Sequence, residues 1–114
     1  ERTLIRQEEQ QLYEYDEYKL QIRRLDFGKK RGIYEFSTYD PETKDTPPSW
    51  GLHPYAEVGV VLEGKMEVNL DGTVYLLGPG DSIYIKPNLY HTMRNAGDTP
   101  CRSFWHLQIM DDSV

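Results

Sequence analysis

Two histidines and one glutamate are the side chains in this sequence that could do chemistry together. His53 and Glu57 are four residues apart, and His91 lies downstream of them, at the border of another β-rich segment. Imidazole nitrogens and carboxylate oxygens bind divalent metals and hydrogen-bond to small molecules. If the intervening segments fold back on themselves, the three side chains can meet inside a barrel. Their types and positions therefore suggest a metal site or a small-ligand site.

Short strands are the elements that must position these residues. Alternating apolar and polar residues, many of them β-branched or aromatic, favour strands, and no stretch combines helical periodicity with caps at both ends. Asp71–Gly72 predicts a tight hairpin turn, because both residues tolerate positive φ. The prolines within residues 40–49 predict a loop. We expect an all-β sandwich or barrel, with strands over residues 18–25, 33–39, 58–63, 65–70, 73–77, 82–85, 90–94 and 102–110.

Length, charge and cysteine content limit the class of protein. The 114 residues make one domain, in which we expect residues 1–17 to be a solvated N-terminal arm and residues 18–114 the barrel. The net charge of −6 comes without a basic stripe, so we expect no direct nucleic-acid binding by this domain. No apolar run approaches the ~20 residues needed to cross a bilayer, so we expect no membrane insertion. The single cysteine, Cys101, excludes an internal disulfide and fits a cytoplasmic location.

The sequence around His53 and Glu57 resembles the first motif of the cupin superfamily. That motif reads His-x-His, three or four residues, Glu, six residues, Gly. In this chain His53, Glu57 and Gly64 occupy its last three places. Gly51 stands where the family has its first histidine, so one of the family's metal ligands is missing.

The sequence around His91 resembles the second cupin motif, which reads Gly, five residues, Pro-x-Gly, two residues, His, three residues, Asn. Gly80, His91 and Asn95 fit this motif, whereas Lys86 replaces its Pro and Asn88 replaces its central Gly. The second replacement is mild, because Asn tolerates the left-handed conformation that Gly serves there. The two motifs stand in the family's order, with its spacing.

The resemblance implies a double-stranded β-helix, which is a jelly-roll-like barrel, with one divalent metal inside. His53, Glu57 and His91 would be the metal ligands, and they have the composition of a facial triad with open positions. Iron, zinc, nickel and manganese remain alternatives, because imidazole suits most of them. A fourth ligand could be water or His106, for which the alternative is an ordinary strand histidine. The alternative to a metal site is a binding module whose polar residues only hydrogen-bond inside the barrel.

Aromatic residues and a methionine of the predicted strands are candidates for lining a ligand cavity. The alternative for each is ordinary packing in the core. These residues are Tyr34, Phe36, Met66 and Trp105.

A narrower resemblance is to the C-terminal cupin of bacterial helix-turn-helix transcriptional regulators. It rests on residues 58–68, 76–85 and 4–9. In that family the cupin senses a small effector and biases an attached DNA-binding domain. A chain that starts without Met and carries an acidic arm is what such a module would look like after excision. The resemblance therefore implies an effector-binding module, with no catalytic residue assigned.

Two other functions remain open. The chain could be a stand-alone metal-dependent cupin enzyme, such as a dioxygenase, isomerase or lyase acting on a small polar substrate. It could also be a structural or interaction module with a filled barrel. In each case the cupin resemblance implies a homodimer, in which a strand around residues 4–6 could be exchanged between subunits.

Overall fold

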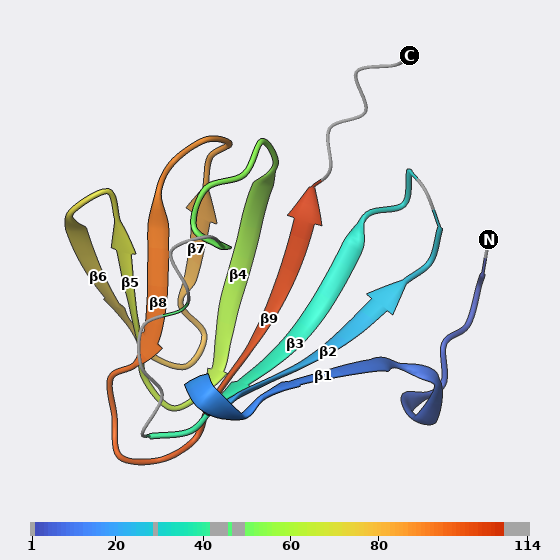
Figure 1. The fold of residues 1–114 in the computed structure, drawn as a ribbon, viewed down its shortest axis with the longest axis horizontal. Coiled ribbons are helices and arrows are strands. Elements are labelled where there is room, and N and C mark those ends of the chain that lie inside the picture. Colours follow the sequence, from blue (N-terminus) through green and yellow to red (C-terminus); the bar gives the residue numbers. More distant parts are fainter. Residues whose placement is uncertain (1, 29, 42–45, 47–49, 109–114) are drawn as a thin grey trace.

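Two antiparallel sheets make up the fold in the computed structural model, which describes residues 2–28, 30–41, 46 and 50–108. Six strands form one sheet in the order β1-β2-β3-β9-β4-β7, and three form the other in the order β6-β5-β8. Figure 1 shows the larger sheet fanning out from β7 and β4 toward β1, with the smaller sheet beside β7. The expected all-β architecture is confirmed. The elements are η1 Gln7–Glu9, β1 Gln11–Tyr15, η2 Asp16–Tyr18, β2 Leu20–Asp26, β3 Ile33–Tyr39, β4 Ala56–Glu63, β5 Met66–Leu70, β6 Thr73–Leu77, β7 Ser82–Ile85, β8 His91–Asn95 and β9 Cys101–Gln108.

Strand periodicity decides which side chains enter the space between the sheets. Successive residues of a strand point to opposite faces, and in β3 and β9 every second residue is buried. β3 pairs with β9 so that Glu35 lies opposite Trp105 and Ser37 opposite Ser103. These inward positions mix polar and aromatic residues, and they form one wall of a cavity. The buried residues of the two strands are Glu35, Ser37, Tyr39, Cys101, Ser103, Trp105 and Leu107.

The apolar core lies between the smaller sheet and the β4–β7 side of the larger one. Met66 and Val68 of β5 are fully buried, as are Val61 of β4 and Ile85 of β7. Cys101 is equally buried, and burial raises the pKa of its thiol to about 11. The thiol is therefore protonated at neutral pH and packs as a small apolar side chain.

Two turns confirm what their residue types predicted. Asp71 and Gly72 have φ values of +47° and +96°, and they join β5 to β6 with Leu70 opposite Thr73. This is the positive-φ pair that a tight hairpin needs. Asn88, which replaces the glycine of the family motif, has a φ of +61° and so takes the left-handed conformation.

The N-terminal region differs from the expected solvated arm. Gln11–Tyr15 form β1, which pairs with β2 along its whole length, whereas Leu4 and Ile5 lie outside the strands. The pairing partly buries two aromatic side chains, because Tyr13 and Tyr15 are less exposed than their neighbours in β1. Within the described part of the chain, no helix is long and apolar enough to span a membrane.

Candidate metal centre

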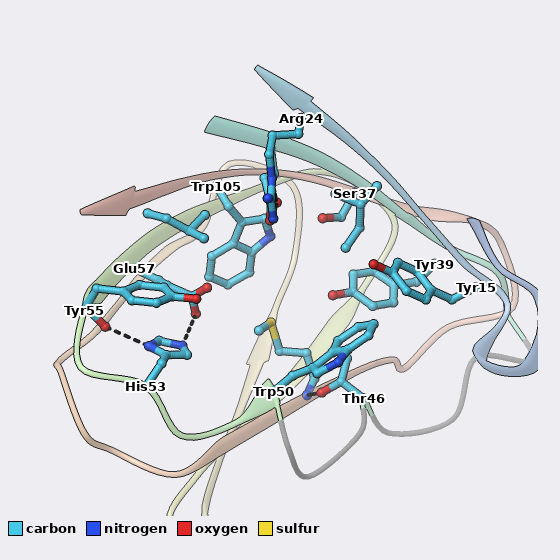
Figure 2. A pocket seen from close by; sticks show the side chains of 14 residues that line it. Tyr15, Arg24, Ser37, Tyr39, Thr46, Trp50, His53, Tyr55, Glu57 and Trp105 are labelled. Carbon is cyan, nitrogen blue, oxygen red and sulfur yellow. Dashed lines mark hydrogen bonds and ion pairs between the residues drawn. The ribbon is translucent and has the colours of Figure 1, made fainter. Parts of the chain in front are cut away.

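A cavity of about 330 Å³ lies on the inner face of the larger sheet. Figure 2 shows His53, Tyr55 and Glu57 on one side of it and Trp50 and Thr46 on another. Tyr55 stacks on the His53 ring, with 3.9 Å between ring centroids and 9° between planes. The cavity is of a size that admits a small molecule.

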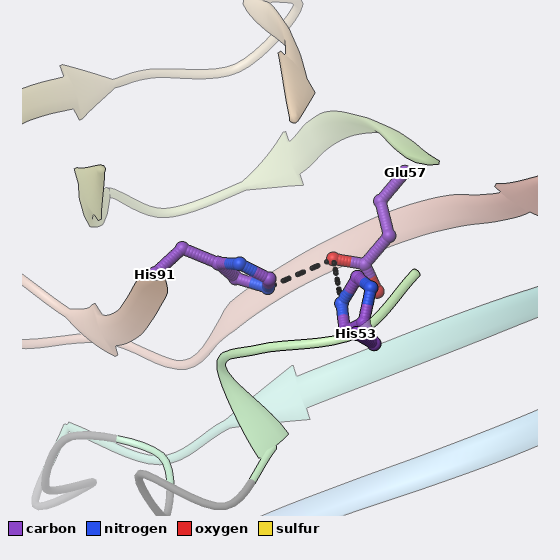
Figure 3. Close-up of side chains that lie close together, drawn as sticks. All are labelled: His53, Glu57 and His91. Atoms are coloured by element: carbon purple, nitrogen blue, oxygen red, sulfur yellow. Dashed lines mark ion pairs between the residues drawn. The ribbon is translucent and has the colours of Figure 1, made fainter. Parts of the chain in front are cut away.

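His53 and Glu57, which line this cavity, meet His91 in one cluster (Figure 3). His53 lies in the loop that precedes β4, Glu57 points inward from β4, and His91 is the first residue of β8. The cluster therefore joins a loop and both sheets, which is why residues distant in sequence come together. One ligand atom from each residue lies within 4.8 Å of the other two, so the three residues could hold a metal ion.

Backbone hydrogen bonds fix the two segments that carry the histidines. The amide of Asn88 donates to the carbonyl of His53 at 2.8 Å, and the amide of His91 donates to the carbonyl of Gly51 at 2.9 Å. The left-handed turn at Asn88 thus positions the start of β8 against the loop before β4.

The hydrogen bonds of the imidazole rings fix their tautomers. Nδ1 of His53 lies 2.9 Å from the carbonyl oxygen of Tyr55, and Nδ1 of His91 lies 2.9 Å from that of Leu89. A carbonyl oxygen can only accept, so each Nδ1 must carry the proton. In the neutral rings Nε2 then presents a lone pair, which is the form of histidine that binds metals.

Three electron-rich atoms face one another in the buried cluster. Oε2 of Glu57 lies 3.1 Å from Nε2 of His91 and 3.6 Å from Nε2 of His53. Neither of these two contacts has the geometry of a hydrogen bond. Glu57 Oε2 and His53 Nε2 are therefore buried polar atoms without a hydrogen-bond partner. Such atoms are unfavourable unless a cation or a proton satisfies them. A divalent metal ion fits this donor set.

The pKa of His91 shows how the cluster behaves without a metal. Burial is the largest single influence and lowers this pKa, but contact with Glu57 and the Leu89 carbonyl outweighs it. The net result is a pKa above the ordinary histidine value, so a proton competes with a metal for Nε2.

The other residues expected at the site lie in three different places. Trp105 lines the cavity, whereas Met66 is fully buried in the core and is not part of the cavity wall. Tyr34, Phe36 and His106 occupy the outward positions of β3 and β9, where the Tyr34 ring stacks on His106 at 4.7 Å. His106 therefore lies outside the cluster, because strand alternation turns it away from the inward Trp105 and Leu107.

Sequence reasoning did not assign most residues of the cavity wall, among them Arg24, Glu35, Trp50 and Tyr55. One signal was available for Arg24, which shares a strand face with Leu20 and Ile22 in the alternation of β2. A charged residue on an otherwise apolar face indicates a polar feature inside the fold. Trp50 follows a proline-containing loop, and nothing local to it predicts that it faces a cavity.

The family model for the cupin domain matches residues 35–107, which is more than half of the chain. A polyketide synthase, CurC, from Streptomyces cyaneus is 41% identical over 56 residues, which cover 48% of this chain and 36% of CurC. This chain spans well under two thirds of the length of the curated relatives that it matches first.

Two solved structures share the fold. An RmlC-like cupin from Shewanella frigidimarina has a TM-score of 0.75 at 20% identity, with 100% of this chain and 97% of that chain covered. The cupin domain of an XRE-family transcriptional regulator from Enterobacter cloacae has a TM-score of 0.70 at 17% identity, with 82% and 99% covered. With both cupin motifs in place and the family model matched, this chain belongs to the cupin domain family.

Proposed function

We propose that this cupin binds a divalent metal ion and senses a small molecule, as the effector-binding module of a transcriptional regulator. One observation carries the metal part of the proposal: two Nε2 lone pairs and a carboxylate face one another in a buried cluster. Because His53 and Glu57 also line the cavity, a ligand in the cavity would lie directly beside the metal.

The sensing mechanism follows from the position of the cluster between the sheets. A metal held by His53, Glu57 and His91 would supply positive charge that binds an oxygen atom of the effector. An effector shifts a regulator only by its differential affinity for two states. The contacts between the loop before β4 and the start of β8 are the elements through which binding could favour one state. Similarity to the cupin domain of an XRE-family regulator supports this assignment.

A metal-dependent enzyme acting on a small polar substrate is the second candidate function. Three protein ligands leave metal positions open, which suits substrate binding. The similarity to the polyketide synthase CurC supports this alternative.

Mass spectrometry of bound compounds separates the two functions. Zinc-loaded and iron-loaded protein is incubated with a library of small polar metabolites. The compounds in the library are identified before incubation, and those retained by the protein are identified after it. A sensor is expected to return its ligand unchanged, whereas an enzyme releases a product that depends on His91. The regulator assignment also requires a helix-turn-helix segment in the same reading frame, and a full gene without one would refute it.

We further propose a homodimer formed through the outward face of the larger sheet. Tyr34, His106, Val58 and Tyr84 follow one another across β3, β9, β4 and β7 in that face, and Val58 and Tyr84 are exposed. A row of aromatic and aliphatic side chains on a sheet is favourable to cover. Light scattering should therefore give a dimer mass, and Val58→Glu should give a monomer. A monomer mass for the unmodified protein at high concentration would contradict this.

A further inference from the structure

A partly buried ion pair forms the wall of the cavity away from the proposed metal ligands. Nε and Nη2 of Arg24 lie 2.8 and 2.6 Å from Oε2 of Glu35. The guanidinium also lies over the Tyr13 ring, with Cζ 5.2 Å from the ring centroid. The carboxylate is well buried at 10% exposure, whereas the Arg24 side chain is 34% exposed. Arg24 is thus held in place and still offers donors to the cavity that it lines.

Strand register places this pair relative to the metal ligands. Arg24 lies opposite Glu35, Glu35 opposite Trp105, and Trp105 opposite Gly59. Glu57 occupies the neighbouring inward position of β4, two residues before Gly59. Arg24 and Glu57 are therefore three strand spacings apart in the sheet, roughly 14 Å between backbones. Figure 2 shows Arg24 and the His53–Glu57 group on different sides of the cavity.

Aromatic rings line the space between the two polar ends. The Trp105 ring packs over Gly59, where an added Cβ would lie 2.5 Å from two of its ring carbons. Trp50 faces the cavity from the loop and meets Tyr15 edge to face at 4.7 Å between centroids. The absence of a side chain at Gly59 lets the indole lie flat along the wall. The space suits a flat, apolar molecular body.

The charges of the wall indicate which ligand this space favours. Arg24 is positive, and Glu35 and Glu57 are negative, so these three groups give the cavity a net charge of −1. A divalent metal at the histidine–glutamate cluster changes this to +1. A low-dielectric cavity with one excess positive charge favours a monoanion.

We propose that Arg24 is the anion-binding residue of a ligand subsite, and that the ligand is a small carboxylic acid with a flat apolar body. Its carboxylate binds the Arg24 guanidinium, its body lies between the aromatic residues, and its far end reaches the metal. This inference rests on the proposed metal-binding function, because the metal supplies the excess positive charge. It goes beyond that function by naming the chemical class of the ligand and the residue that recognises it.

Benzoate and the neutral benzamide, which have nearly the same shape, provide the test on zinc-loaded protein. Both tryptophans of the chain, Trp50 and Trp105, line the cavity, so tryptophan emission reports on its occupancy, alongside calorimetry. We expect benzoate to bind about tenfold more tightly than benzamide or better, in line with a charge-assisted hydrogen bond. We expect Arg24→Gln to remove this preference.

Glu35→Gln separates anion binding from a purely structural ion pair. It removes a competing negative charge and frees donors of Arg24, so benzoate affinity should rise, opposite to the effect of Arg24→Gln. A structural pair would make both variants weaken binding or leave both unchanged. Arg23→Gln is the matched control, because Arg23 precedes Arg24 and points to the other face of β2. If Arg24→Gln fails to fold, Arg24→Gln/Glu35→Gln keeps a neutral pair and should still lose benzoate selectivity.

Zinc titration of the same variants separates the two proposals. Unmodified protein that binds no zinc would refute the metal site. Normal zinc binding with benzoate affinity that ignores Arg24 would place the carboxylate on the metal and overturn the anion subsite alone. Equal binding of benzoate and benzamide to zinc-loaded protein would overturn it as well.

Discussion

Replacing His91 with alanine is expected to abolish stoichiometric metal binding. The His91 side chain is 3% exposed and offers its Nε2 lone pair to the cluster. An alanine side chain offers no lone pair at this buried position. Loss of an outer-shell partner lowers metal affinity about 10–100-fold, and loss of a direct ligand should exceed about 100-fold. Glu57→Gln should act similarly, because it removes the negative charge while preserving size. Elemental analysis and zinc calorimetry measure both effects.

His106→Ala is the control for this experiment. His106 is one of the three histidines of the chain, and it stacks on Tyr34 away from the cluster. We expect its replacement to leave zinc affinity unchanged. Metal binding that survives His91→Ala, or that is lost with His106→Ala, would refute the assignment of the ligands.

Titrations at two pH values test the competition between proton and metal. In metal-free protein the His91 pKa is raised on folding, so its contribution to stability is complete below about pH 6.5, the unfolded value. That contribution is lost as pH rises through the folded pKa. The metal needs a deprotonated Nε2, so the stabilisation gained from zinc should grow across the same interval. Melting temperatures with and without zinc should therefore diverge from pH 6 to pH 8.

The sequence predicted that His53, Glu57 and His91 would come together, because each of these residues belongs to a motif with its own spacing. Glu57 and His91 lie in or at the start of strands whose periodicity was clear, and Asp71–Gly72 and Asn88 fixed the turns that set the register. A motif of this kind fixes both the residue type and its place along a strand. The meeting of both histidines with the glutamate then follows from the fold.

The cavity wall could not be predicted in the same way, because hydrophobicity assigns the wrong face of β3. Tyr34 and Phe36 look like interior residues, yet Glu35 and Ser37 point inward and the aromatic rings cover the outer face. The inward carboxylate of Glu35 is paired there with Arg24 from the neighbouring strand. A long-range partner of this kind cannot be recognised from local alternation.

Replacing Gly51 with alanine is expected to destabilise the fold and to weaken the metal site together. A Cβ at this position would lie 2.2 Å from the carbonyl oxygen of His91, closer than non-bonded atoms can approach. The obstacle is backbone at the start of β8, and the His91 amide is bound to the Gly51 carbonyl, so neither segment can move freely. We expect a loss of about 3 kcal/mol or more in the free energy of unfolding, at the upper end for overpacking. Chemical denaturation measures this loss.

The same close approach leaves no room for the first histidine of the cupin motif in this backbone. A histidine at this position would carry the same Cβ, so Gly51→His should displace His91 and lower zinc affinity, although it adds an imidazole. Gly78→Ala is the control, because its Cβ would have no neighbour closer than 3.8 Å, and we expect a change within about 0.5 kcal/mol. A folded Gly51→His protein that binds zinc more tightly would show that the loop can retreat from β8. In that case backbone packing at Gly51 would not be what limits the site to three protein ligands.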